Sequence, residues 1–303
     1  MTGFVWITGM ALWAAAIGLP MVWVLGRGFW QDVHEFGQSI DWLVVWNSFL
    51  KAAGIAAVSV ILGFGPARLL AESRWKGGVF VFLLLPLVLP SYMLYYAWNL
   101  MLDPTTGLGQ CIGQVPGLAG QMGGWSAWIV LCLWYWPIAA MLMGHGFRGL
   151  GTEVFERARL EAGGSRRFWI IVLPLMLSSI VPAFVVCMMM AMAEFTTFHL
   201  SAVRTIGTEL AVVYELTGSS AAVARAGWPM LIAALAAGWI LSRAAIGRYR
   251  GDDTVGVVSR SHSRSLWGWF AGLCLMSWII PASLMAGFVR EIGPFREYFV
   301  LHA

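Results

Sequence analysis

The chain has 303 residues, of which 59% are hydrophobic and 11% are charged, and its formal net charge is +4. This composition excludes an ordinary soluble domain, in which about a quarter of the residues are charged. Apolar stretches of about 20 residues, the length that crosses roughly 30 Å of hydrocarbon, recur along the chain and predict an all-α, polytopic membrane protein.

Seven apolar segments predict transmembrane helices, roughly over residues 3–25, 45–66, 79–102, 126–147, 170–193, 226–242 and 265–289. No charge precedes the first segment, and it is too long for the apolar region of a signal peptide, so we expect it to be retained as a span. The predicted organisation has three parts: a six-helix transmembrane domain over 1–245, a basic linker over 246–264, and a seventh helix with a short tail over 265–303.

Lysine and arginine are concentrated in alternate loops. Of the 19 in the chain, 3, 5 and 5 fall in the loops 67–78, 148–169 and 243–264, respectively. The positive-inside rule therefore predicts that these three loops face the cytoplasm, and that the N-terminus lies there too.

The sequence contains no motif of a nucleotide-hydrolysing or metal-dependent enzyme. Its two lysines, Lys51 and Lys76, follow Leu50 and Trp75, which excludes a phosphate-binding loop that ends in Gly-Lys-Ser/Thr. No cluster of histidine and cysteine has the spacing of a metal site. We therefore expect a protein that is not an enzyme, with no catalytic, cofactor-binding or metal-binding residues of its own.

Polar residues within or beside the spans are few. Lys51 lies near the start of the second span, where its long side chain is expected to reach the interface. No acidic residue lies in the middle of a span, although proton-coupled transporters usually need one there. Glu194, at the outer end of the fifth span, is compatible with coordination of a cationic substrate or with an interfacial position, and we favour the second. A translocating protein built this way would take its energy from another subunit.

The densest group of charges separates the fourth and fifth spans. Residues 148–169 hold eight charged side chains. Their order is Glu156-Arg157-Ala158-Arg159-Leu160-Glu161-Ala162-Gly163-Gly164, followed by Leu173-Pro174. This order resembles the EAA loop of ABC-importer permeases, which forms a short coupling helix in a groove of the cytoplasmic ATPase. An amphiphilic, charged segment that ends at glycine is what a short interfacial docking helix requires.

The loop departs from the family pattern, E-A-A-x-x-x-G followed by I-x-L-P, at three places. Arg157 replaces the first alanine after Glu156. Ala162 takes the position of the glycine, with Gly163 next, and Pro174 arrives one residue early. The position of the loop, after span four and before span five, is the one it has in six-helix permease halves.

Two further regions resemble permeases of the ferric-iron, thiamine and phosphonate branch of these importers. The first begins at residues 46–50, W-N-S-F-L, and continues through the second span to the Leu-Pro-rich residues 83–92. The second comprises residues 194–198 and 203–209, after the fifth span. The three regions occur in the expected order, and the likeness covers about residues 40–245.

The resemblance implies a permease subunit of an ATP-driven, binding-protein-dependent ABC importer in a bacterial inner (plasma) membrane. The implied partners are cytoplasmic ABC ATPase subunits, a periplasmic solute-binding protein, a second permease half in a homodimer or heterodimer, and membrane lipid, but no nucleic acid. ATP would bind to the ATPase partner. Among the cargoes of this branch, we favour ferric iron for this chain.

The resemblance also implies an ATPase-coupling site. Its residues are Glu156, Ala158, Arg159, Glu161, Gly163, Gly164, Leu173 and Pro174. The charged members would provide polar docking contacts, and the two glycines would form the turn that ends the short helix. The alternative interpretation of these charges is a solvated loop that also enforces topology.

Two other classes of protein stay open. A secondary transporter or channel would work without an ATPase, and inverted repeats or broken helices with ion-binding carbonyls would favour it. No clear internal repeat is visible. A membrane-embedded enzyme is disfavoured, because no catalytic constellation is visible. The seventh span leaves a further choice, between a half-size permease and the N-terminal part of a permease that has two halves.

Overall fold

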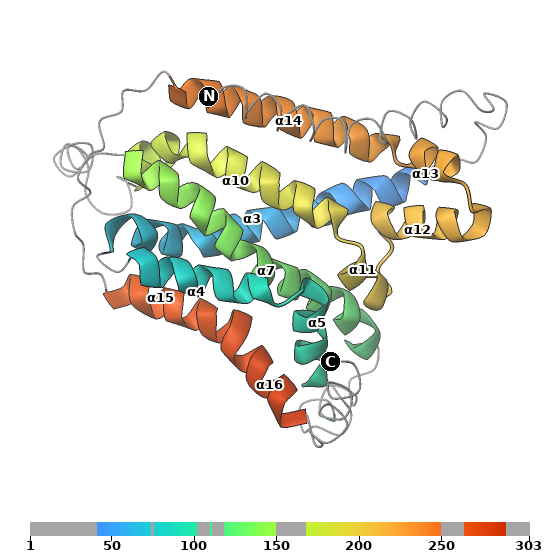
Figure 1. Cartoon of the computed structure of the whole chain (residues 1–303), viewed down its shortest axis with the longest axis horizontal. Coiled ribbons are helices and arrows are strands. Elements are labelled where there is room, and N and C mark those ends of the chain that lie inside the picture. The colour runs from blue at the N-terminus through green and yellow to red at the C-terminus, as the bar shows by residue number, and fades with distance from the viewer. Residues whose placement is uncertain are drawn as a thin grey trace, which may run out of the picture.

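The computed structural model describes residues 41–73, 76–101, 110, 118–149, 168–249 and 264–288. The first predicted span, most of the charged segment 148–169 and most of the basic linker lie outside these residues. Every element in the described part of the chain is a helix, so the all-α prediction is confirmed. The elements are α3 (Trp42–Glu72), α4 (Lys76–Val88), α5 (Ser91–Leu100), α7 (Leu118–Gly149), η3 (Phe168–Val172), α10 (Leu173–Ala193), α11 (Thr196–Leu200), α12 (Ile206–Thr217), α13 (Ser220–Ala226), α14 (Trp228–Tyr249), α15 (Arg264–Cys274), η4 (Leu275–Ile279) and α16 (Ile280–Phe288) (Figure 1).

Four helical stretches are long and apolar enough to cross a membrane. They are Trp42–Glu72, Gly124–Arg148, Trp169–Ala193 and Arg264–Gly287. Two further pairs, α4 with α5 and α13 with α14, qualify only as bent pairs, so the described residues hold up to six spans. These stretches coincide with the second to seventh predicted spans, and the chain is a polytopic helical membrane protein.

The prediction of one continuous helix over residues 79–102 is wrong. The chain breaks between α4 and α5, which meet at 77°. Pro90 lacks a backbone N–H and disfavours the helical conformation of Leu89, so the helix ends there. The indole Nε1 of Trp134 donates to the Leu89 carbonyl at 2.7 Å, which satisfies a backbone group that the break exposes. The sixth predicted span, residues 226–242, coincides with α14 apart from its first two residues, and the chain bends by 58° just before it, between α13 and α14.

The centre of the bundle is α7, which packs against α3, α4, α5 and α10. In the most apolar 18-residue window of its candidate span 61% of the residues are buried, against 39% in the corresponding windows of α3 and of η3 with α10. Two glycines permit the close approach of neighbouring helices. A Cβ on Gly63 of α3 would lie 2.8 Å from the Trp136 carbonyl oxygen, and a Cβ on Gly146 of α7 would collide with the side chain of Ser179.

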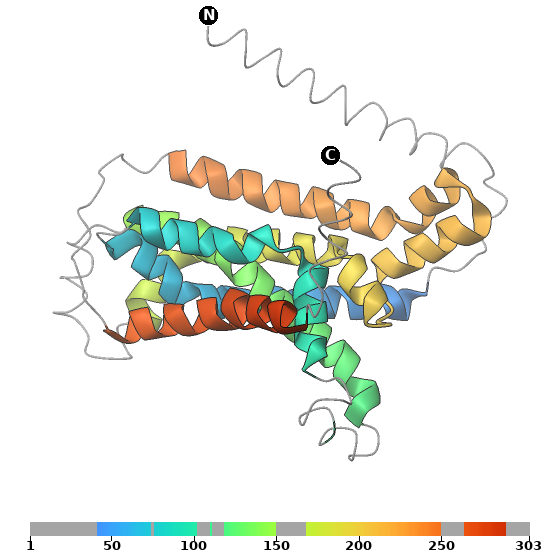
Figure 2. The ribbon, with the colours of Figure 1, turned by 60° about the horizontal axis from the view of Figure 1, so that its bottom comes forward.

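The C-terminal span, formed by α15, η4 and α16, packs against α3, α4, α5 and α7. Figures 1 and 2 show it on the side of the bundle opposite α14. The buried Trp136 indole donates to the Ser277 hydroxyl at 2.7 Å. The indole of Trp269 donates to the Leu62 carbonyl at 3.1 Å. Because Pro66 has no N–H for that carbonyl, the neighbouring span supplies the donor that α3 lacks.

Six of the seven exposed tryptophans among the described residues lie toward the ends of spans. They are Trp42, Trp46 and Trp125 near the starts of α3 and of the α7 span, and Trp169, Trp267 and Trp269 near the starts of η3 and α15; the seventh, Trp239, lies within α14. Indole rings at both limits of a span are typical of the two membrane–water interfaces.

Candidate functional site

Two ends of the bundle are candidates for function, and they differ in charge. The ends of α3, α7 and α14 and the starts of α4, η3 and α15 lie together at the left of Figure 1, and we name this the basic end. The basic residues of these helix ends are Arg68, Lys76, Arg148, Arg243, Arg248 and Arg264. The three predicted cytoplasmic loops therefore all leave the bundle from one end, as their charge pattern requires.

Most of the predicted coupling site lies outside the described residues. Glu156, Ala158, Arg159, Glu161, Gly163 and Gly164 belong to this group. The chain leaves the basic end at Gly149 and returns to it at Phe168. Leu173 and Pro174 begin α10, directly after the π-helical turn η3, with Leu173 half-buried and Pro174 exposed. Pro174 has no N–H to donate to the carbonyls of η3, the helical turn that directly precedes α10.

An ion pair at the end of α3 was missed by the sequence analysis. Arg68 Nε lies 2.7 Å from Glu72 Oε1, one helical turn away. The Glu72 side chain is only 6% exposed, and its second oxygen, Oε2, is buried without a hydrogen-bond partner among the described residues. The i, i+4 spacing is the only sequence signal for this pair. Burial of Glu72 depends on packing, which spacing does not reveal.

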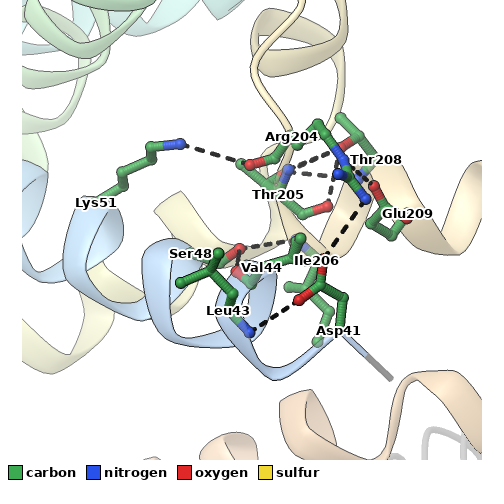
Figure 3. A network of polar contacts seen from close by, with 10 residues as sticks. All are labelled: Asp41, Leu43, Val44, Ser48, Lys51, Arg204, Thr205, Ile206, Thr208 and Glu209. Carbon is green, nitrogen blue, oxygen red and sulfur yellow. Dashed lines mark hydrogen bonds and ion pairs between the residues drawn. The ribbon is translucent and has the colours of Figure 1, made fainter. Parts of the chain in front are cut away.

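The opposite end carries a polar network that joins α3 to the start of α12 (Figure 3). Asp41 caps α3, its carboxylate accepting from the backbone N–H of Leu43 at 3.0 Å. The guanidinium of Arg204 lies between Asp41, at 3.8 Å, and Glu209, at 2.8 Å. The hydrogen bond to Glu209 raises the pKa of Arg204. Arg204 is 67% exposed, so these ion pairs contribute little stability by themselves.

Side-chain contacts with the backbone fix the same junction more firmly. Ser48 donates to the Val44 carbonyl at 2.7 Å and accepts from the N–H of Ile206 at 2.8 Å. Lys51 Nζ donates to the Arg204 carbonyl at 3.5 Å. Lys51 was expected to reach toward the interface, and the structure gives it a definite protein partner there (Figure 3).

The start of α12 is defined by a capping box. Thr205 Oγ1 accepts from the N–H of Thr208 at 3.4 Å, and Thr208 Oγ1 accepts from the N–H of Thr205 at 2.8 Å. This reciprocal pair satisfies backbone donors that no helix can satisfy internally. The capping box orients the chain that leaves the network, so the junction of α3 with α12 is a fixed element of this end.

A second cluster at the opposite end gathers around Glu194, which follows the last residue of α10. Its Oε1 accepts from the Thr197 N–H at 3.0 Å, the Thr197 hydroxyl at 2.8 Å and the Ser91 hydroxyl at 3.1 Å. Thr197 is fully buried and Ser91 nearly so. We name Ser91, Glu194 and Thr197 the Glu194 cluster. The sequence predicted the position of Glu194 at a span end, but it could not predict the partner Ser91, which lies 103 residues away.

In both clusters a carboxylate oxygen accepts hydrogen bonds or ion pairs from groups of the fold, so these groups join helices to one another. Among the described residues, no group of three or more His, Cys, Asp and Glu side chains is placed to hold a metal ion. Glu194 is half-buried directly after the last residue of α10, and its position at the membrane interface stays a prediction.

No protein-family model and no curated protein matches this sequence. Among solved structures, the chain is similar to one in the crystal structure of a bacterial alginate ABC transporter in complex with an alginate pentasaccharide-bound periplasmic protein. The two chains share 16% sequence identity, the likeness covers 84% of this chain and 96% of that chain, and the TM-score is 0.49.

Proposed function

We propose that this chain is the permease subunit of an ATP-driven ABC importer and forms, with a second permease half, a solute pathway across a bacterial inner membrane. The observation that carries the proposal is the place of the charged segment 148–169. It joins α7, the central helix, to α10, and it leaves the bundle at the basic end. A partner that moved this segment would therefore act directly on the core.

In this proposal the basic end and the N-terminus face the cytoplasm. ATP binds to two ATPase subunits, whose closure draws the coupling segments of the two permease halves together. The α7 and α10 helices then tilt, which closes the basic end and opens the opposite end. The close helix contacts at Gly63 and Gly146 favour rigid-body movement, because closely packed helices resist independent deformation.

A periplasmic solute-binding protein would deliver the solute at the opposite end. The branch of the family and the cargo, for which we propose ferric iron, rest on the resemblance of residues 46–50, 83–92, 194–198 and 203–209. Within the coupling segment, Glu156, Arg159 and Glu161 would contact the ATPase through polar bonds.

A secondary transporter or channel is the second candidate, and the two bent pairs favour it. Broken helices in such transporters expose backbone carbonyls that bind ions. The break between α4 and α5 has the required form, but the Leu89 carbonyl accepts from the Trp134 indole instead. Because the Leu89 carbonyl already accepts this hydrogen bond, it is not free to bind an ion, and we favour the permease over the secondary transporter.

Charge reversal in the coupling segment tests the proposal. The double variant Glu156→Arg/Glu161→Arg should lower occupancy of the ATPase complex by roughly 10- to 100-fold, because like charges would meet in a matched interface. The measurements are co-purification of the ATPase and uptake of the cognate solute. Glu215→Arg, an exposed carboxylate of α12 at the opposite end, is the matched control and should leave co-purification unchanged.

Unchanged co-purification and unchanged uptake in the double variant would contradict the coupling role. If no ATPase co-purifies with the unmodified chain in several detergents, the secondary transporter becomes the better candidate. Membrane insertion should stay normal in either case, because surface substitutions usually change stability by about 0.5 kcal/mol or less.

A further inference from the structure

The segment between α10 and α12, residues 194–206, is anchored to two different spans. It contains the short helix α11 and lies at the opposite end of the bundle. Its first residues contact α5, the bent half of a span, and its last residues contact α3. We name this segment the strap.

The first anchor is the Glu194 cluster. Ser91 begins α5, and its hydroxyl donates to Glu194 Oε1 at 3.1 Å. Pro90 precedes α5 and provides no side-chain cap. The carboxylate of Glu194, bound to Ser91, is the acidic group beside the start of this helix, where negative charge is favourable. Thr197 binds the same oxygen through its N–H and its hydroxyl, which fixes the carboxylate against the start of α11.

The second anchor consists of contacts between side chains of α3 and the backbone of the strap. Ser48 accepts from the N–H of Ile206 at 2.8 Å, and Lys51 Nζ donates to the Arg204 carbonyl at 3.5 Å (Figure 3). Both contacts hold the backbone itself, so the end of the strap follows α3 whenever α3 moves.

The strap also holds the one residue other than glycine with a positive φ in the described part of the chain. Ala202 has a φ of 54°, in the left-handed region. The N–H of Ala202 binds the His199 carbonyl at 3.0 Å and the N–H of Val203 binds the Phe198 carbonyl at 2.9 Å. This is the Schellman arrangement that ends a helix, in which glycine usually takes the left-handed position. An alanine there is strained, because its Cβ approaches the backbone carbonyl.

We propose that the strap couples the bent span α4–α5 to α3, and that strain at Ala202 keeps it poised for release. When α5 moves away from the end of α10, the contacts of Glu194 break and the left-handed turn can relax. The relaxation frees the backbone at Arg204 and Ile206 from α3. Glu194 is thus a positioning residue that acts through α5. The strap is a property of this chain, and its use in transport rests on the proposed function.

Amide hydrogen exchange of the purified full chain in lipid nanodiscs tests the coupling. Glu194→Ala should speed exchange at residues 91–101 and also at residues 41–51, by roughly 10- to 100-fold, because a charged hydrogen-bond acceptor is lost. Glu194→Gln keeps an acceptor Oε1 and should stay close to the unmodified chain. Glu215→Ala, the exposed matched control on α12, should change neither segment, and exchange within the α7 core should stay constant in every variant.

Relief of strain provides the opposite test. Ala202→Gly should slow exchange in both segments by roughly 2- to 5-fold, because glycine adopts the left-handed conformation without a steric cost. Ala202→Val should speed it, since a β-branched residue is poorly tolerated there. If the Glu194→Ala variant does not insert into the membrane, Ser91→Ala serves in its place. It removes one hydrogen-bond donor to Glu194 and should speed amide exchange in both segments to a smaller extent.

The proposal is overturned if Glu194→Ala loosens residues 91–101 alone, if neither segment responds, or if Ala202→Gly speeds exchange.

A second measurement separates the strap from the proposed function. In a complex with the ATPase, Glu194→Ala should raise ATP hydrolysis in the absence of solute and Ala202→Gly should lower it. If the exchange results hold but no ATPase co-purifies, the strap stands and the proposed function fails.

Discussion

The central helix α7 and the C-terminal span are equally apolar but are packed very differently. The most apolar 18-residue windows of their candidate spans have the same mean hydropathy, yet 61% of the window in α7 is buried within the protein and only 22% of the window in the C-terminal span. In lipid, apolar character alone provides no force between helices, so small residues and polar contacts decide the packing. Helix α7 approaches Gly63 of α3 with its backbone and receives the Ser179 side chain of α10 at its own Gly146, whereas the C-terminal span is held by Ser277 and Trp269.

The largest expected effect on stability comes from replacing a glycine at the close contact between α3 and α7. Gly63→Val should lower the free energy of unfolding by about 3 kcal/mol, because the new side chain meets the Trp136 carbonyl and the Ala140 N–H of α7. Gly272→Val on α15 is the matched control, since a Cβ there meets nothing within 4 Å. It should change the free energy by about 0.5 kcal/mol or less. Equilibrium unfolding in mixed detergent micelles measures both, and equal effects would contradict the comparison.

A smaller effect is expected at the buried anchor of the C-terminal span. Ser277→Ala should cost about 2 kcal/mol, because it leaves the buried Trp136 N–H without an acceptor. Ser283→Ala, on the same span but exposed and bonded only to the Ile280 carbonyl, should be nearly neutral. The double variant Ser277→Ala/Trp136→Phe should cost less than the sum of the single changes, since both polar groups are then removed. Additive costs would exclude this hydrogen bond as the anchor.

The smallest effect concerns the donor that the C-terminal span supplies to α3. Trp269→Phe should cost about 1 kcal/mol, because the Leu62 carbonyl then has neither an indole donor nor a donor from Pro66. Trp267→Phe, whose described contact is with the ring of Phe270, provides the control for loss of an exposed indole. The same unfolding measurement applies. If the Trp269→Phe variant is as stable as the control, the Leu62 carbonyl does not depend on the indole donor, and this prediction is wrong.

The sequence predicted where spans exist better than how they run. Hydropathy located each described span, but the pattern of residues 79–102 did not reveal the 77° break at Pro90. Proline alone does not specify such a break, because α7 continues through Pro137 and α10 through Pro182. The outcome depends on whether a neighbour such as Trp134 satisfies the freed carbonyl, and this is a property of packing.

In the candidate sites, too, the sequence predicted individual residues but not the contacts that packing creates between them. Sequence spacing identified the coupling residues Glu156 to Gly164, and their role stays a prediction because they lie outside the described residues. It also drew attention to Lys51 and Glu194, as polar groups near span ends. It gave no sign of the strap, because Lys51 and Arg204 are 153 residues apart and Ser91 and Glu194 are 103 residues apart.

The sequence by itself determined that this chain is an all-helical, multi-pass membrane protein, because the cost of placing a segment in hydrocarbon depends on that segment's own side chains. The same local property determined the concentration of basic residues in alternate loops. Only the tertiary structure decided that α7 is central, that Trp269 completes the backbone bonding of α3, and that Glu194 holds the start of α5. These contacts join residues far apart in the chain, so they exist only when the whole bundle has packed.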